Sequence, residues 1–256
     1  MIIGFANQKG GVGKTSACLA FGLGMVEKGK HVLFVDMDPQ GSLGFIIGND
    51  DSDYTLNEVL IGKVDINKAV QDHVGFDLIP GSMELANADK TLTGVGKEHR
   101  LKEALQTLKK KYDYIVLDTP PALSLLTICA LTACDQVIIP TQADVLAMHG
   151  LGIFYETFGM VRKYLNPNLE LAGILLTKHS SRTNLNKELT EIVEGIATKI
   201  GTKVFTTTIR ESVKVRESQT YKQSLYEYAP TNPVTDDCRA FVDEYLALNA
   251  KKRKKQ

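Results

Sequence analysis

Apolar residues follow two patterns along this chain. Short runs rich in Ile, Val, Leu and Phe end at acids or turn residues, which is typical of strands buried on both faces of a sheet. Longer segments carry apolar residues every three or four positions, which is typical of helices packed on one face. From the short runs we predict strands at residues 2–6, 31–36, 76–80, 114–118, 136–140, 171–177 and 203–207.

The longer segments predict helices at residues 15–27, 97–111, 123–133, 151–165, 185–200 and 235–249. The fourth of these has the clearest amphipathic pattern, with apolar residues at alternating steps of three and four: Leu151, Phe154, Phe158, Val161 and Leu165. Because strands and helices alternate, we predict an α/β fold with a mostly parallel, twisted sheet and helices on both faces.

Length and composition favour a single domain. The chain has 256 residues, 43% of them hydrophobic, which is enough for one sizeable core. We predict one domain over residues 1–250 and a basic, disordered tail over 251–256. No apolar run reaches the ~18 residues of a membrane span, and the chain starts inside the first predicted strand without a signal-peptide pattern. We therefore expect a cytoplasmic protein that does not enter a membrane.

A glycine-rich turn, Lys9-Gly10-Gly11-Val12-Gly13-Lys14-Thr15, joins the first predicted strand to the first predicted helix. It ends in the G-K-T of a phosphate-binding loop (P-loop), in which backbone N–H groups surround phosphates, the lysine reaches the β/γ oxygens and the hydroxyl holds Mg²⁺. The helix that follows directs its positive end at the same place. The candidate nucleotide contacts are Lys9, Gly10, Gly11, Val12, Gly13, Lys14, Thr15 and Ser16. Lys9 is a cation that an ordinary P-loop lacks. The alternative to a functional role is that Lys9 is an ordinary solvated lysine of the loop.

Carboxylates end two of the predicted strands. Asp118 closes the strand at 114–118 in the form of a Walker B acid, which would hold Mg²⁺ beside the Thr15 hydroxyl. Asp36 and Asp38 follow the strand at 31–36, on the edge where open α/β sheets bind ligands. Taken alone, each acid could equally cap a turn or a helix. Together with the P-loop, they predict an ATP and Mg²⁺ site with Thr15 and Asp118 at the metal and with Asp36 and Asp38 at the same edge.

These motifs resemble those of one ATPase family. The sequences K-G-G-V-G-K-T, D-M-D-P-Q and D-T-P-P are similar to the deviant Walker A ATPases of the ParA/MinD superfamily, and Asn7-Gln8 resembles its ParA/Soj branch. The resemblance implies a P-loop NTPase fold, catalytic roles for Lys9, Lys14 and Asp38, and a homodimer that encloses two ATP molecules. In that dimer Lys9 would enter the partner's site, Asp38 would orient the attacking water and Asp36 would sense Mg²⁺ and the γ-phosphate.

The chain departs from the family at the loop that borders the base. Family members commonly have I-P-R-N there, whereas this chain has Ile209-Arg210-Glu211-Ser212. We carry over only the location, with Ile209, Arg210 and Ser212 as candidate contacts.

Basic residues are segregated, although the 30 basic and 30 acidic residues cancel overall. Residues 178–222 hold nine basic against five acidic side chains, and residues 251–255 are all basic. Grouped cations are suited to contact nucleic-acid phosphates. The alternative interpretation is that these residues form an ordinary solvated surface without a binding role. The candidate DNA contacts are Lys199, Lys203, Arg210, Lys214 and Arg216.

The resemblance implies an ATP-hydrolysing, Mg²⁺-dependent switch for partitioning a chromosome, plasmid or mobile element. Its ATP dimer would bind nonspecific double-stranded DNA on the bacterial nucleoid, and a ParB-like centromere-binding protein would stimulate hydrolysis. One alternative is a MinD-like ATPase of the membrane surface, but residues 249–256 lack the large apolar side chains of an anchor. A metabolic relative of the same fold is the other alternative.

Overall fold

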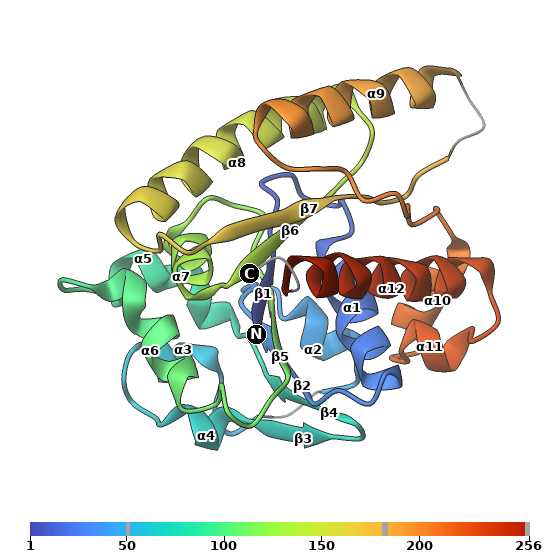
Figure 1. Cartoon of the computed structure of the whole chain (residues 1–256). Helices are drawn as coiled ribbons and strands as arrows, with labels where there is room; N and C mark the ends of the chain where they lie inside the picture. The colour runs from blue at the N-terminus through green and yellow to red at the C-terminus, as the bar shows by residue number, and fades with distance from the viewer. Residues whose placement is uncertain (50–51, 181–183, 254–256) are drawn as a thin grey trace.

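One mostly parallel sheet forms the centre of the molecule in a computed structural model that describes residues 1–49, 52–180 and 184–253 (Figure 1). The strand order is β3-β4-β2-β5-β1-β6-β7, and of these neighbours only β3 and β4 are antiparallel. The strands are β1 (Ile2–Phe5), β2 (Val32–Asp36), β3 (Gln71–His73), β4 (Phe76–Ile79), β5 (Tyr114–Asp118), β6 (Gln136–Thr141) and β7 (Glu170–Leu176).

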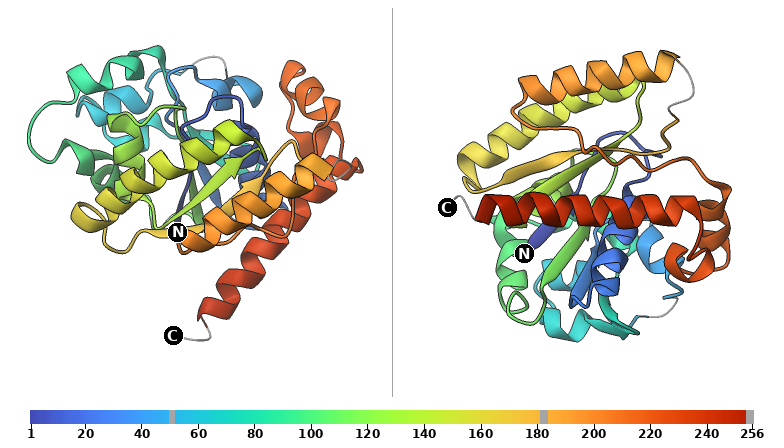
Figure 2. Two further views of the ribbon diagram at one scale, coloured as in Figure 1. Left: turned by 90° about the horizontal axis from the view of Figure 1, so that it is seen from above. Right: turned by 45° about the vertical axis from the view of Figure 1, so that its right-hand side comes forward.

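Helices cover both faces of this sheet, which confirms the predicted fold class (Figures 1 and 2). On one face lie α1 (Lys14–Glu27), α2 (Ser42–Ile46), α10 (Val213–Thr220), α11 (Leu225–Tyr228) and α12 (Pro233–Arg253). On the other lie α3 (Leu56–Leu60), α4 (Ile66–Ala69), η1 (Met83–Asn87), α5 (Ala88–Thr91), η2 (Lys97–His99), α6 (Arg100–Gln106), α7 (Leu125–Ala133), α8 (Val145–Tyr164) and α9 (Asn184–Lys199).

The alternation of strand side chains divides the core into two layers. Ile2 packs with the α7 and α8 side, whereas Ile3 packs with the α1 and α12 side. Both residues are fully buried, which explains why the strand sequence is apolar at every position.

Strand register places the candidate residues along one edge. Phe5 pairs with Asp118, and Asp118 pairs on its other side with Asp36. Because these three strands are parallel and in register, their carboxyl ends meet at the same level. The P-loop, which follows Phe5, therefore begins beside both acids.

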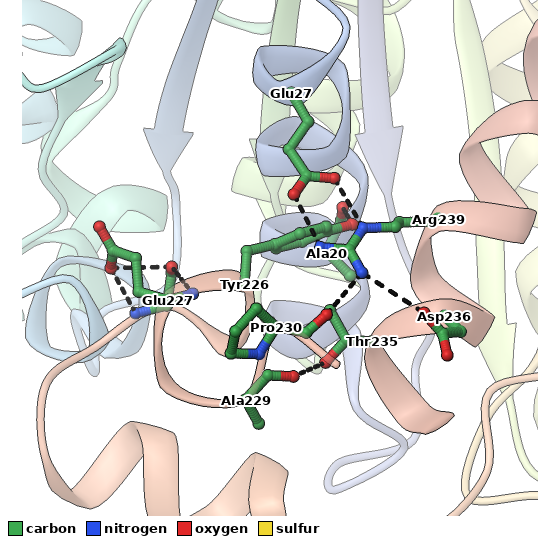
Figure 3. Close-up of polar contacts among 10 residues, drawn as sticks. Ala20, Glu27, Tyr226, Glu227, Ala229, Pro230, Thr235, Asp236 and Arg239 are labelled. Carbon is green, nitrogen blue, oxygen red and sulfur yellow. Dashed lines mark hydrogen bonds and ion pairs between the residues drawn. The ribbon is translucent and has the colours of Figure 1, made fainter. Parts of the chain in front are cut away.

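Helix α1 lies unusually close to its neighbours because of two glycines in its interior. A Cβ on Gly22 would come within 2.2 Å of the Phe34 ring, and one on Gly24 within 2.7 Å of the Tyr226 hydroxyl. Glycine normally weakens a helix, so its presence here reflects the need for close packing. At the surface, α1 is also bound to α12, because Arg239 of α12 donates to both carboxylate oxygens of Glu27, each at 2.9 Å (Figure 3).

Several element predictions need correction. Residues 203–207 run beside β7 through an isolated bridge between Ile174 and Val204 instead of forming a full strand. The helix predicted at 97–111 is divided into η2 and α6, and α8 begins six residues before its predicted start. Strand β3 and the short helices were missed, because segments of three to eight residues are too short for a periodicity to show.

At the carboxyl end of the chain, α12 continues to Arg253 and so includes the first half of the predicted tail. Residues 254–256, the rest of that tail, lie outside the described residues. Within the parts of the chain that the structure describes, no helix combines the length and the apolar character needed to cross a membrane.

Candidate functional site

The P-loop occupies the turn between β1 and α1 and lines a cavity of about 1010 Å³. Gly11 and Gly13 have φ values of 74° and 82°, in the left-handed region that side chains other than glycine rarely adopt. The turn ends where the Ala17 amide donates to the Gly13 carbonyl and starts α1. Of the predicted P-loop contacts, these line the cavity: Gly10, Gly11, Gly13, Lys14, Thr15 and Ser16.

Lys14 is a buried cation that lines this cavity. Its side chain is 7% exposed, and burial lowers the pKa of its ammonium group. The charges of Asp118 and Asp38 oppose that effect and favour the charged form. A buried ammonium group that faces a cavity is well suited to bind a phosphate oxygen, because the ion pair would replace the water that it has lost.

Asp118 is fully buried, and neither of its carboxylate oxygens has a hydrogen-bond partner among the described residues. Burial and the charge of Asp36 raise its pKa well above the ordinary range, while the nearby Thr15 hydroxyl and Lys14 act in the opposite direction. A buried carboxylate whose oxygens accept no hydrogen bond is costly in its charged form, so this geometry favours a bound cation.

The residues present suit Mg²⁺ in particular. The described part of the chain has no cluster of three or more His, Cys, Asp or Glu side chains that could enclose a metal ion. Mg²⁺ commonly binds through one or two carboxylates together with water and substrate phosphates. Asp118 with the Thr15 hydroxyl could supply the protein's share of such a shell.

Asp36 has a structural task that the sequence did not reveal. One of its oxygens accepts from the Asp38 amide at 3.0 Å, and the other accepts from the Leu43 and Gly44 amides at 3.0 and 3.3 Å. Burial raises its pKa to about 6, and these amides act against that rise. Asp36 therefore holds the loop that carries Asp38, which lines the cavity. Its predicted role at Mg²⁺ stays a prediction.

Lys9 is not among the residues that line this cavity. Its ammonium group lies 2.5 Å from a carboxylate oxygen of Asp144, in the loop between β6 and α8. Its amide donates to the Asn7 side chain, which in turn donates to the Pro140 carbonyl at 2.7 Å. Lys9 therefore lies on the outer side of the P-loop, about one third exposed.

The loop predicted to border the base does line the cavity, through Ile209, Arg210 and Ser212. Arg210 is held by Asp237 of α12 through contacts of 2.6 and 2.7 Å, and Ser212 caps α10 by accepting from the Lys214 amide. Helix α10 was not predicted, yet its Gln219 donates to the Ser16 hydroxyl at 3.0 Å. Nothing in the local sequence of α10 indicates that contact.

Two further residues that sequence reasoning missed follow β7. Thr177 and Lys178 contact the P-loop backbone, and both line the cavity. The signal available for them was their position at the carboxyl end of a predicted strand, where open α/β sheets bind ligands.

The five candidate DNA contacts do not gather in one place. Lys199 ends α9, and residues 200–212 then cross the molecule before α10, which carries Lys214 and Arg216 (Figures 1 and 2). From Val204 to Arg210 the chain runs alongside β7, a distance of roughly 20 Å for extended backbone. Arg210 is paired with Asp237, and Lys214 with Glu217. The predicted single basic face is therefore divided into two groups.

Comparison with known proteins gives matches over most of the chain. Residues 1–171 match the family described as an AAA domain. The sporulation initiation inhibitor protein Soj of Bacillus subtilis is 38% identical over 234 residues, which are 90% of this chain and 91% of that protein. The chromosome partitioning protein ParA of Caulobacter vibrioides is 34% identical, over 89% of this chain and 86% of its own.

Among solved structures, cobyrinic acid a,c-diamide synthase from Mycobacterium smegmatis, with a bound ATP analogue and magnesium, has a TM-score of 0.83 and 33% sequence identity. The match covers 94% of this chain and 92% of that one. The P-loop, the acids at the strand ends and these matches lead to one assignment: the chain belongs to the family described as an AAA domain and to the ParA/Soj group of the ParA/MinD superfamily of ATPases.

Proposed function

We propose that the chain is an ATP-hydrolysing, Mg²⁺-dependent switch that partitions DNA. Two ATP-bound subunits form a sandwich dimer that holds double-stranded DNA without sequence preference, on the nucleoid. Hydrolysis, stimulated by a ParB-like centromere-binding protein, separates the dimer and releases the DNA. The relatives named Soj and ParA support this function, as do the motifs of the nucleotide site.

The main observation in support of the proposed dimer is the position of Lys9. A P-loop lysine outside its own cavity, paired at 2.5 Å with Asp144 near the surface, can reach a second subunit once that pair opens. An exposed pair of this kind contributes about 0–1 kcal/mol, so a triphosphate in a facing subunit would compete well for the ammonium group.

The cavity residues divide the work of phosphoryl transfer between them. Lys14 and the amides at the start of α1 bind the β- and γ-phosphates, and Lys9 of the facing subunit adds charge as the transition state forms. Asp38, held by the loop that Asp36 anchors, positions the attacking water. Thr15 and Asp118 would hold Mg²⁺, which neutralises phosphate charge when bound.

The dimer is tested by light scattering with Mg²⁺ and a nonhydrolysable ATP analogue. We expect wild type to elute at twice the protomer mass, and Lys9→Gln to bind the analogue with wild-type affinity yet elute as a protomer. Lys14→Ala is the control that loses nucleotide binding itself. A Lys9→Gln variant that dimerises as wild type does would remove the basis of the sandwich.

DNA retention is tested on unrelated duplexes of equal length, with the ATP analogue present. Retention should fall steeply across a salt series, because phosphate contacts release counterions. The two basic groups are changed separately, Lys199 with Lys203 to Gln and Lys214 with Arg216 to Gln, so that the contacting group is identified. Anionic liposomes provide the other arm. Liposome binding without DNA retention would contradict DNA partitioning and favour a membrane-surface ATPase.

A further inference from the structure

We infer that Thr177 and Lys178 are positioning residues that orient the P-loop amides toward the phosphates. The Thr177 hydroxyl lies 2.6 Å from the Val12 carbonyl oxygen, and the Lys178 ammonium group lies 2.7 Å from the Gly11 carbonyl oxygen. Two consecutive side chains after β7 thus bind two consecutive carbonyls of the P-loop, which is about 165 residues away in sequence. We call this pair the clamp.

Planar peptide geometry explains what the clamp does. In a trans peptide unit the C=O and the following N–H point in opposite directions. Holding the Gly11 carbonyl therefore turns the Val12 N–H away from Lys178, and holding the Val12 carbonyl turns the Gly13 N–H away from Thr177. Both N–H groups are then presented on the side opposite the clamp, as in the anion-binding concavities that successive amides form.

The two residues contribute in different ways. Thr177 is 4% exposed, and its hydroxyl also lies 3.0 Å from the Thr141 carbonyl. Its single proton can go to only one acceptor, and the shorter distance favours Val12. Lys178 is exposed and positively charged, so it polarises the peptide unit whose carbonyl it holds and strengthens the Val12 N–H as a donor.

Backbone conformation also singles out Lys178. Its φ is 47°, in the left-handed region, and among the described residues the other non-glycine with positive φ is Lys222. A lysine in this conformation is strained, and such strain often marks a functional site. Asn adopts the conformation more easily, which allows the ammonium group to be removed without adding backbone strain.

The inference rests on the proposed ATPase function, but its test uses nucleotide binding alone. Dissociation constants for fluorescent ADP and ATP are measured with Mg²⁺ and without DNA, on the full chain. Lys178→Asn should bind both nucleotides about tenfold more weakly, as expected for the loss of one partly solvated charged hydrogen bond, with thermal stability at or above wild type. Lys178→Arg should restore most of the affinity.

Two comparisons make the result specific. Lys222→Asn is the matched control, because Lys222 has the same backbone conformation (φ 51°) and its ammonium group lies 5.0 Å from the centre of the Phe45 ring of α2. It should bind nucleotide as wild type does. Thr177→Val should weaken binding as well, and Thr177→Ser should recover it, because the hydroxyl returns.

Wild-type affinity in Lys178→Asn would overturn the clamp, and so would an equal loss in Lys222→Asn. Failure of the proposed function is recognised separately, by a wild-type chain that binds both nucleotides but retains no DNA.

Discussion

At the scale of single residues, the nucleotide site holds charges that its own fold does not satisfy. Asp118 is buried without a hydrogen-bond partner among the described residues, and Lys14, which lines the cavity, is nearly as buried. Such groups lower the free energy of unfolding of the ligand-free protein, and ligand binding raises it again. This exchange is expected of a switch whose ligand must change its structure.

Asp118→Asn should make the ligand-free protein more stable. Burial raises the pKa of Asp118, so the folded state binds this proton more strongly than the unfolded state does. Wild-type stability therefore falls as pH rises above about 4, and the variant lacks that fall. In EDTA, its melting temperature should exceed that of wild type by a few degrees at pH 7 and by less at pH 5.

The same variant should lose the stabilisation that Mg²⁺ and ATP give to wild type. If Asp118→Asn melts below wild type in EDTA at pH 7, the carboxylate is satisfied in a way that the described contacts do not include.

Gly81→Ala should damage catalysis without removing nucleotide binding. A Cβ at this position would lie 2.8 Å from the Asp38 carbonyl oxygen and 2.9 Å from that of Asp36, and both are backbone atoms that cannot rotate away. The loop carrying Asp38 must therefore shift. A shift of about 1 Å at a catalytic group can cost about 100-fold in turnover, so we expect a loss of that order in steady-state ATPase assays.

The matched control is Gly195→Ala, because a Cβ there meets nothing within 4 Å. It should leave turnover unchanged. Normal turnover in Gly81→Ala would show that hydrolysis does not depend on the position in which this loop holds Asp38.

At the scale of elements, α10 and α11 form one wall of the cavity and are held by contacts with α1 and α12. Tyr226 of α11 donates to the Ala20 carbonyl of α1 at 2.7 Å, and Arg239 of α12 donates to the Pro230 carbonyl at 2.6 Å (Figure 3). Arg239 also lies over the Tyr226 ring. The wall is therefore fastened by contacts between elements, because short helices such as these are not stable alone.

Arg239→Ala should lower the melting temperature through loss of this fastening. The side chain is about one third exposed, so its ion pair with Glu27 counts for little, and the hydrogen bond to Pro230 and the ring contact count for more. We expect a loss of about 1–2 kcal/mol, or roughly 2–6 °C, measured by calorimetry. Arg162→Ala, at an exposed arginine of α8, is the control and should change the melting temperature little.

Saturating ADP should recover part of the Arg239→Ala loss, since nucleotide fills the cavity that this wall encloses. If the melting temperature of Arg239→Ala equals that of wild type, α11 is held by its apolar contacts alone.

At the scale of the whole molecule, the structure describes a protomer in which the Lys9 ammonium group forms an ion pair within its own chain. The pair with Asp144 connects the P-loop to the loop before α8, which are 135 residues apart. In the proposed dimer, this internal pair competes with insertion of Lys9 into the facing subunit. Opening the pair is therefore one of the costs of dimerisation.

Asp144→Asn should strengthen dimerisation on the ATP analogue by removing this competition. Each pair is partly exposed and contributes at most about 1 kcal/mol, and two pairs open per dimer, so the dimer dissociation constant should fall up to about 30-fold in sedimentation experiments. Asp243→Asn, which breaks the ion pair with Lys28 at the surface of α12, is the control and should leave the constant unchanged. Weaker dimerisation in Asp144→Asn would mean that Asp144 holds Lys9 in its active position instead.

The sequence by itself determined the features that depend on neighbouring residues. The P-loop, the acids at the ends of β2 and β5, and the alternation of strands and helices are local patterns, because backbone conformation and burial periodicity act over a few residues. These patterns were enough to predict the parallel strands of the sheet and the positions of Lys14, Asp38 and Asp118 at its edge.

Only the tertiary structure decided which distant residues complete the site. The pairing of Lys9 with Asp144, the contact of Gln219 with Ser16, and the clamp of Thr177 and Lys178 join segments 135 to 203 residues apart. The same is true of the division of the basic residues into two groups. Such contacts depend on how layers pack and on which strand ends meet, and no local pattern carries that information.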